Sequence, residues 1–131
     1  MKSFSVLPLL FLALSLQAQV AFDDYFTDRT MRFDFVMAGN STTTKVFPVS
    51  FREEPFWGGS LVNLIDPFNY GNFRYEIFDA VTGKLIYSRG FCTLYQEWQT
   101  TAEAKQMERV FQEVATFPFP KNKVNFVLSI R

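Results

Sequence analysis

Three stretches of the chain alternate between apolar and polar positions, which is the pattern of a β-strand with one buried face. They are Met31–Met37, Phe47–Phe51 and Val124–Ile130. In the second stretch Phe47, Val49 and Phe51 are expected to share the apolar face, with Pro48 on the other. Because proline has no backbone N–H to give to a central ladder, we expect this strand at a sheet edge or at a β-bulge.

A β-hairpin is predicted in the middle of the chain. Phe73–Phe78 and Leu85–Arg89 are rich in aromatic and β-branched residues, which suit a pleated, half-buried surface. Between them, the side chain of Asp79 can accept hydrogen bonds from nearby backbone amides, and Gly83 can take a positive φ at little cost. The hairpin is expected to be a scaffold of the fold.

One short helix is predicted after the hairpin. Thr100 and Glu103 have the spacing of a capping box, and good helix formers follow, so we expect a helix at Thr101–Gln106. The residues before it, Phe91–Tyr95, are expected to continue extended. After the helix the period is ambiguous: one helical face would hold Met107, Val110, Phe111 and Val114, and one strand face would hold Arg109, Phe111, Glu113, Ala115 and Phe117. A strand that runs to about Phe117 is favoured.

These elements together predict an all-β fold. Six or more short strands with little helix indicate a single immunoglobulin-like antiparallel β-sandwich with one short helix, formed by residues 19–131. Pro118–Asn122 is expected to be the turn before the last strand. That strand runs to Arg131 with no polar tail. From this layout we expect that the sequence is part of something longer, or that a second domain once followed.

The N-terminus predicts export. Lys2 precedes an apolar run over residues 4–16, and small residues follow, which is the layout of a secretory signal peptide. Cleavage after Ala18, which removes residues 1–18, is favoured, and cleavage after Ala21 is the alternative. A buried N-terminal helix is the other interpretation, and the run is short for a membrane anchor. The mature chain is therefore expected to be secreted or periplasmic, within the cell envelope, with no membrane partner.

Composition limits the other partners. Lys and Arg together number 13, as do Asp and Glu, so no basic footprint for nucleic acid is present. The 17 Phe residues predict an aromatic-rich core. Cys92 is the only cysteine, which excludes an intrachain disulfide, and it is expected to be a small buried hydrophobe rather than a reactive thiol.

Catalytic constellations are missing. The chain has no His, which excludes an HExxH zinc site and Ser-His-Asp or Cys-His catalysis, and it has no glycine-rich phosphate loop. Glu53 and Glu54 are adjacent, but neighbours on an extended segment point to opposite faces and would not share a substrate. Asp23, Asp24 and Asp28 lack the spacing of a calcium loop and are expected to be solvated. The composition leaves a carboxylate-only glycosidase open, but the small size of the domain and the lack of an evident cleft argue against it. We predict that the chain alone is not an enzyme and holds no metal or cofactor.

Candidate binding residues are the aromatic side chains around the long loop over residues 53–72. Long ordered loops tend to be functional or to be packed by their own side chains. Trp57 and Tyr70 could form a platform that stacks on a sugar or contacts a partner, and packing under the loop is the favoured alternative. With Phe68 and Trp98 they make up the possible binding or docking surface.

Five stretches taken together resemble a known family. They are Phe22–Asp28 (FDDYFTD), Glu54–Ser60 (EPFWGGS), Asn63–Asn72 (NLIDPFNYGN), Thr82–Phe91 (TGKLIYSRGF) and Glu97–Thr101 (EWQTT). The set is similar to the N-terminal domain of the immunoglobulin-A peptidase family, secreted zinc metallopeptidases typical of Bacteroides-like gut bacteria. The similarity covers nearly the whole chain beyond the signal peptide.

The resemblance implies a β-sandwich that precedes a separate catalytic domain, which carries the zinc site in that family. It carries over no catalytic or zinc-binding residue to this sequence. The expected function is therefore that of a non-catalytic accessory module, which packs against or positions a catalytic domain in cis. The alternative is a stand-alone secreted module that binds a glycan or a protein. The first hypothesis predicts an exposed apolar patch where the catalytic domain would dock.

Overall fold

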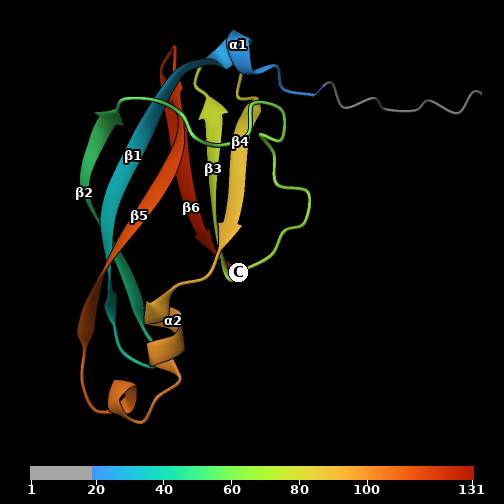
Figure 1. Ribbon diagram of the computed structural model, residues 1–131. Coiled ribbons are helices and arrows are strands. Elements are labelled where there is room, and N and C mark those ends of the chain that lie inside the picture. Colours follow the sequence, from blue (N-terminus) through green and yellow to red (C-terminus); the bar gives the residue numbers. More distant parts are fainter. Residues whose placement is uncertain (1–18) are drawn as a thin grey trace, which may run out of the picture.

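Two three-stranded antiparallel sheets face each other in the computed structural model, which describes residues 19–131 (Figure 1). The signal peptide predicted at residues 1–18 lies outside the described residues. The long sheet has the order β2-β1-β5, and the short sheet has the order β4-β3-β6. The strands are β1 (Phe26–Gly39), β2 (Thr44–Glu54), β3 (Phe73–Asp79), β4 (Leu85–Phe91), β5 (Arg109–Pro120) and β6 (Val124–Ile130). The predicted all-β sandwich is confirmed, and the immunoglobulin-like topology stays a prediction.

The alternation of β1 determines which face of the long sheet becomes core. Phe33, Phe35 and Met37 are buried and face the interior, while Asp34 between them faces outward. Aromatic rings join the two sheets: Phe33 meets Phe126 of β6 edge-on at 4.7 Å between ring centroids. Such contacts supply both buried apolar area and ring geometry. The core is aromatic-rich, as the composition predicts.

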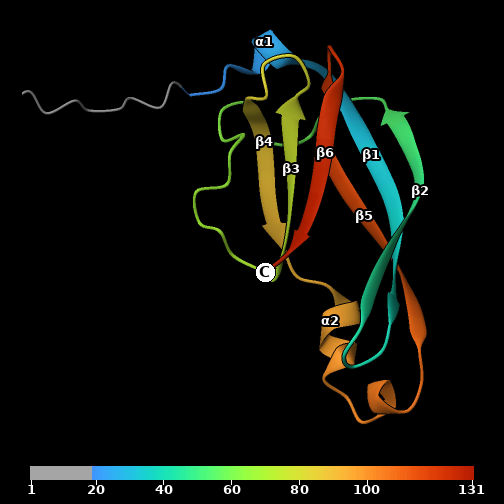
Figure 2. The same cartoon turned by 180° about the vertical axis from the view of Figure 1, so that it is seen from behind.

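The long sheet extends beyond the short one, and its far end is covered by α2 (Leu94–Gln99) instead (Figures 1 and 2). Tyr95 and Trp98 of α2 are buried and lie 5.6 and 5.5 Å from the ring of Phe111 on β5. The hydroxyl of Tyr95 donates to the carbonyl oxygen of Thr43 at 2.8 Å. This helix therefore closes the part of the core that no strand covers.

The helix predicted at Thr101–Gln106 is wrong in position. Only a short 3₁₀ turn, η1 (Glu103–Lys105), forms there, and Thr100 ends α2 instead of opening a helix. The true N-cap is Thr93, whose hydroxyl oxygen accepts from the N–H of Gln96 at 3.1 Å. The expected extended path therefore ends at Thr93.

The reason for this shift is tertiary. Tyr95 and Trp98 are three residues apart, about one helical turn, so a helix puts both rings on one face. Their burial against the long sheet outweighs the local capping signal.

Two further predictions are corrected. β5 continues through Pro118 to Pro120, pairing with the first residues of β1, so the turn is confined to residues 121 and 122. An edge strand tolerates these prolines because their missing N–H groups can face outward. Cys92 is exposed, not buried, because the chain leaves the short sheet there on its way to α2.

The predicted hairpin is confirmed as β3 and β4. The carboxylate of Asp79 accepts from the N–H of Thr82 at 2.8 Å and from its hydroxyl at 2.6 Å, and Gly83 has φ +70°. A short helix, α1 (Phe22–Tyr25), precedes β1. The long loop after β2 runs beside the outer edge of β4, where the N–H of Ser88 donates to the carbonyl oxygen of Leu64 at 3.0 Å.

Candidate functional site

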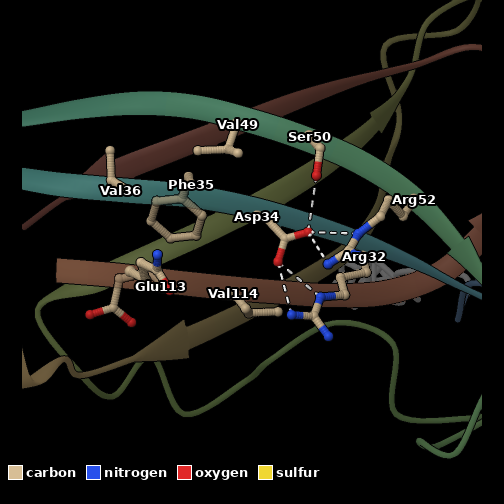
Figure 3. Close-up of a pocket in the computed structure, with 10 residues that line it drawn as sticks. Arg32, Asp34, Phe35, Val36, Val49, Ser50, Arg52, Glu113 and Val114 are labelled. Atoms are coloured by element: carbon tan, nitrogen blue, oxygen red, sulfur yellow. Dashed lines mark hydrogen bonds and ion pairs between the residues drawn. The ribbon is translucent and has the colours of Figure 1, made fainter.

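The outer face of the long sheet carries a network of charges centred on Asp34 (Figure 3). Its carboxylate accepts from Nε of Arg32 at 2.9 Å and from the hydroxyl of Ser50 at 3.1 Å. Arg52 adds two further bonds, from Nη2 at 2.8 Å and from Nε at 3.0 Å. Arg32 also lies 3.3 Å from a carboxylate oxygen of Glu54. These partners are held on adjacent strands, because Asp34 is opposite Ser50 in the β1–β2 register.

The environment of Asp34 favours its charged form. Burial acts to raise its pKa, but the hydrogen bonds from Arg32, Arg52 and Ser50 outweigh this and hold the pKa below its usual value. The carboxylate is therefore a fixed structural anion, with its oxygens already occupied. It has no arrangement suited to acid or base catalysis.

Apolar side chains surround this network on the same face. We call them the outer-face patch; its members are Val36, Phe47, Val49, Val110 and Val114. Val49 is 64% exposed and Val110 is 67% exposed. A depression of about 580 Å³ joins Val36, Val49 and Val114 to the Asp34 network. Exposed apolar side chains gathered on one sheet face make this a candidate interaction surface.

The outer-face patch exists partly because of a β-bulge between β1 and β2. The register slips between Asp34 and Phe35, where Ser50 and Pro48 are the successive partners. The slip places Phe51 opposite Phe33 on the inner face, and Phe47 opposite Val36 on the outer face. The prediction that Phe47, Val49 and Phe51 share one buried face is therefore wrong. The prediction that Pro48 marks an edge strand or bulge is confirmed in both forms.

A second candidate surface is the groove between the long loop and β4, of about 500 Å³. Three of the four aromatic residues named from the sequence, Trp57, Phe68 and Tyr70, line it. The rings of Phe68 and Tyr70 stack with centroids 5.8 Å apart, and the side chains are 69% and 75% exposed. These two rings are not packed under the loop. Trp57 is partly packed, edge-on to Tyr87 at 6.0 Å, with its N–H donating to the carbonyl oxygen of Ser60 at 3.1 Å.

Polar groups fix the shape of this groove. Asp66 accepts from the N–H of Phe68 and from the N–H of Gly90, both at 3.0 Å. Desolvation acts to raise the pKa of Asp66, but these backbone hydrogen bonds lower it below its ordinary value. Gly90 approaches the loop so closely that a Cβ there would lie 2.0 Å from the carbonyl oxygen of Tyr70. The groove is thus tied to β4 rather than free to collapse.

Trp98, the fourth named residue, is not brought to this groove. It is buried in α2, and its indole N–H donates to Glu103 Oε2 at 2.6 Å. No sequence pattern distinguished Trp98 from the surface aromatics, because its burial depends on the non-local contact of α2 with β5.

The acidic residues considered as catalytic or metal-binding candidates do not form a site among residues 19–131. Glu53 is paired with Arg29 and Glu54 with Arg32, so the two carboxylates of the pair diverge as expected. Within residues 19–131 no group of three potential metal-binding side chains comes together. Over the same residues, no helix has the length and apolar character needed to cross a membrane.

The comparisons with known proteins agree with the sequence resemblance. The family model described as Peptidase M64 N-terminus matches residues 21–131, and no curated protein matches the chain. The matched region holds every strand of both sheets, the long loop and both candidate surfaces. The resemblance to the N-terminal domain of the immunoglobulin-A peptidase family is confirmed by this match. The chain belongs to the Peptidase M64 N-terminus family.

Proposed function

We propose that this chain is a non-catalytic accessory domain of a secreted bacterial metallopeptidase, and that it packs against and positions a catalytic domain. The family match supports this, because a family defined by the N-terminus of a peptidase implies a catalytic domain in cis in full-length relatives. The absence of His from the sequence supports the non-catalytic part, since a zinc peptidase normally takes His as a zinc ligand.

The observation that carries the docking part of the proposal is the outer-face patch. Its apolar side chains are exposed on a sheet face that no helix, strand or loop of residues 19–131 covers. Exposed apolar surface of this kind marks interaction sites on soluble domains. The Asp34 network at its centre supplies charges that are already paired and ordered, so docking would not have to immobilise them. The occupant we assign is the catalytic domain.

We also propose export through the N-terminal signal peptide, with residues 19–131 folding in the periplasm or outside the cell. The fold is compatible with either compartment, because it is stabilised by an aromatic core and needs no disulfide.

The reading frame that follows codon 131 in the source DNA tests the proposal. An open frame that encodes an HExxH motif, the usual helical zinc signature, is the expected result. A stop codon at that position, or a continuation without a zinc-binding motif, would contradict docking in cis.

The groove gives specific support to a second function, binding of a glycan or a protein segment. Stacked, exposed aromatic rings beside fixed polar groups are suited to the apolar and polar faces of a sugar. A glycan array probed with wild-type protein, Tyr70→Ala and Phe56→Ala tests this function. Phe56 is the matched control, because it is an exposed aromatic of the same loop that does not line the groove. Binding lost in Tyr70→Ala alone supports the second function, and absence of glycan binding by the wild type excludes it.

A further inference from the structure

β6 ends the short sheet, at the opposite margin from β4 (Figure 2). Its register shows which backbone groups are free. The N–H of Arg131 donates to the carbonyl oxygen of Asn72 at 2.8 Å, and the N–H of Ala80 donates to that of Lys123 at 3.1 Å. Odd-numbered residues of β6 therefore bond to β3, because backbone direction alternates along an antiparallel strand. The N–H and C=O groups that point away from β3 belong to Val124, Phe126, Leu128 and Ile130.

The other three sheet edges of residues 19–131 are protected, each in a different way. The edge of β4 is covered by the long loop, as the Ser88–Leu64 hydrogen bond shows. The edge of β2 is interrupted by Pro48 and its bulge, whereas β5 carries the charged residues Arg109 and Glu113 and ends in Pro118 and Pro120. Charged side chains, prolines, bulges and covering loops are the usual devices against edge-to-edge pairing. β6 has none of them, and its sequence VNFVLSI contains no charge and no proline.

The core is also open on the side of β6. Phe51 of the edge strand β2 stacks on Phe33 at 4.3 Å and lies 6.1 Å from Phe126, yet it is 53% exposed. Phe126 and Leu128 pack against the core but are only partly buried. An additional strand beside β6 would cover these side chains and satisfy the free backbone groups at once.

We propose that the added strand is β6 of a second copy of this chain, paired antiparallel about a two-fold axis at Val127. This register pairs residues whose backbone groups both point outward, with Phe126 opposite Leu128 and Val124 opposite Ile130 of the second copy. The apolar face of β6 thus meets itself, which is the self-complementarity that a two-fold interface requires. The two short sheets become one continuous six-stranded sheet.

Charge does not oppose this pairing. Residues 19–131 contain 12 Lys or Arg and 13 Asp or Glu, and a formal net charge of −1 leaves little long-range repulsion between copies. The register places Lys123 opposite Arg131 of the second copy, but the guanidinium of Arg131 is turned onto Asn69, whose backbone and side-chain oxygens accept from it. The inference does not depend on the proposed peptidase role, because it uses a different part of the surface.

The test is sedimentation equilibrium of the mature chain, residues 19–131, at concentrations up to about 1 mM. The wild type is expected to form a dimer. Val127→Lys should weaken the dimer by about tenfold or more, because it sets two like charges opposite each other at the axis. Val127→Glu should do the same. Mixing the two variants should restore the dimer, because Lys then faces Glu.

One control and a second disrupting variant give the experiment its specificity. Val81→Lys places the same charge at an exposed position in the β3–β4 turn and should leave the dimer unchanged. Ile130→Pro removes an outward N–H at an exposed residue without removing a hydrogen bond to β3, and it should also produce monomers. A wild type that stays monomeric overturns the proposal. A dimer that survives Val127→Lys also overturns it. So does a mixture of Val127→Lys and Val127→Glu that stays monomeric, since either result shows that the two copies do not pair through β6 at Val127.

Discussion

The guanidinium of Arg52 donates two hydrogen bonds to the carboxylate of Asp34, from Nη2 at 2.8 Å and from Nε at 3.0 Å. The two residues lie on neighbouring strands, β2 and β1, and together they anchor the charge network of the outer face. Two-pronged contacts of this kind fix a long side chain that would otherwise be mobile. The outer-face patch therefore surrounds a rigid polar centre, which is what we expect of a prearranged docking surface.

The first prediction concerns the loss of stability at acidic pH and the part that Asp34 plays in it. The folded state lowers the pKa of Asp34, so its stabilising contribution is complete above the unfolded pKa of about 3.9 and is lost as pH falls through the lower folded value. Asp34→Asn removes this contribution. Urea midpoints measured between neutral pH and acid should therefore fall less for Asp34→Asn than for the wild type. Identical slopes for the two proteins would show that the Arg32 and Arg52 bonds do not bias this carboxylate.

A second prediction compares the loss of stability when alanine replaces two glycines, one with a strained backbone alone and one with a steric clash as well. Gly39 has φ +146°, and a Cβ there would lie 2.1 Å from the carbonyl oxygen of Thr43. Gly83 has φ +70° with open space around it. Gly83→Ala should cost about 1–2 kcal/mol from backbone conformation alone. Gly39→Ala should cost more, because the backbone of Thr43 must also move. Chemical denaturation of both variants checks this, and equal losses would contradict the close approach of residues 39 and 43.

A third prediction concerns the two tryptophans. Trp98 of α2 is buried against the long sheet, and Trp98→Ala should lower the free energy of unfolding by about 3–5 kcal/mol. Trp57→Ala is the matched control and should cost less, because Trp57 is only partly buried. Urea unfolding followed by circular dichroism gives both values. A larger loss for Trp57 than for Trp98 would contradict the assignment of Trp98 to the core.

The sequence was sufficient to predict the strands, because the alternation in β1 and β6 and the turn chemistry at Asp79 and Gly83 are local signals. It was not sufficient to place the helix, because Tyr95 and Trp98 form α2 for the sake of burial against Phe111, a residue far along the chain. The outer-face patch was missed for a related reason. A bulge opposite Asp34 and Phe35 changes the face of Phe47 relative to Phe51; Pro48 pointed to an edge or a bulge, but the register slip itself depends on pairing with β1. The groove could not be predicted either, because it depends on the hydrogen bond between Ser88 and Leu64, which is equally non-local.

A fourth prediction concerns the signal peptide. Val20 is buried in the core, and the side chain of Gln19 donates to the carbonyl oxygen of Val62 at 2.9 Å. Cleavage after Ala18 keeps both contacts, whereas cleavage after Ala21 removes them. Intact mass of the exported protein should therefore give Gln19 as its first residue. A protein that begins at Phe22, or one that keeps residues 1–18, would contradict this prediction.

The central claim, that the outer-face patch docks a catalytic domain, is tested most directly by titration calorimetry. Residues 19–131 are titrated with the catalytic domain of a full-length family member, as wild type, as Val114→Glu and as Val81→Glu. Val114 belongs to the patch, and Val81 is an exposed control in the β3–β4 turn. We predict that wild type and Val81→Glu bind equally, and that Val114→Glu binds at least about tenfold more weakly, a difference of about 1.4 kcal/mol. Equal binding by all three proteins, or no binding by the wild type, would contradict the account.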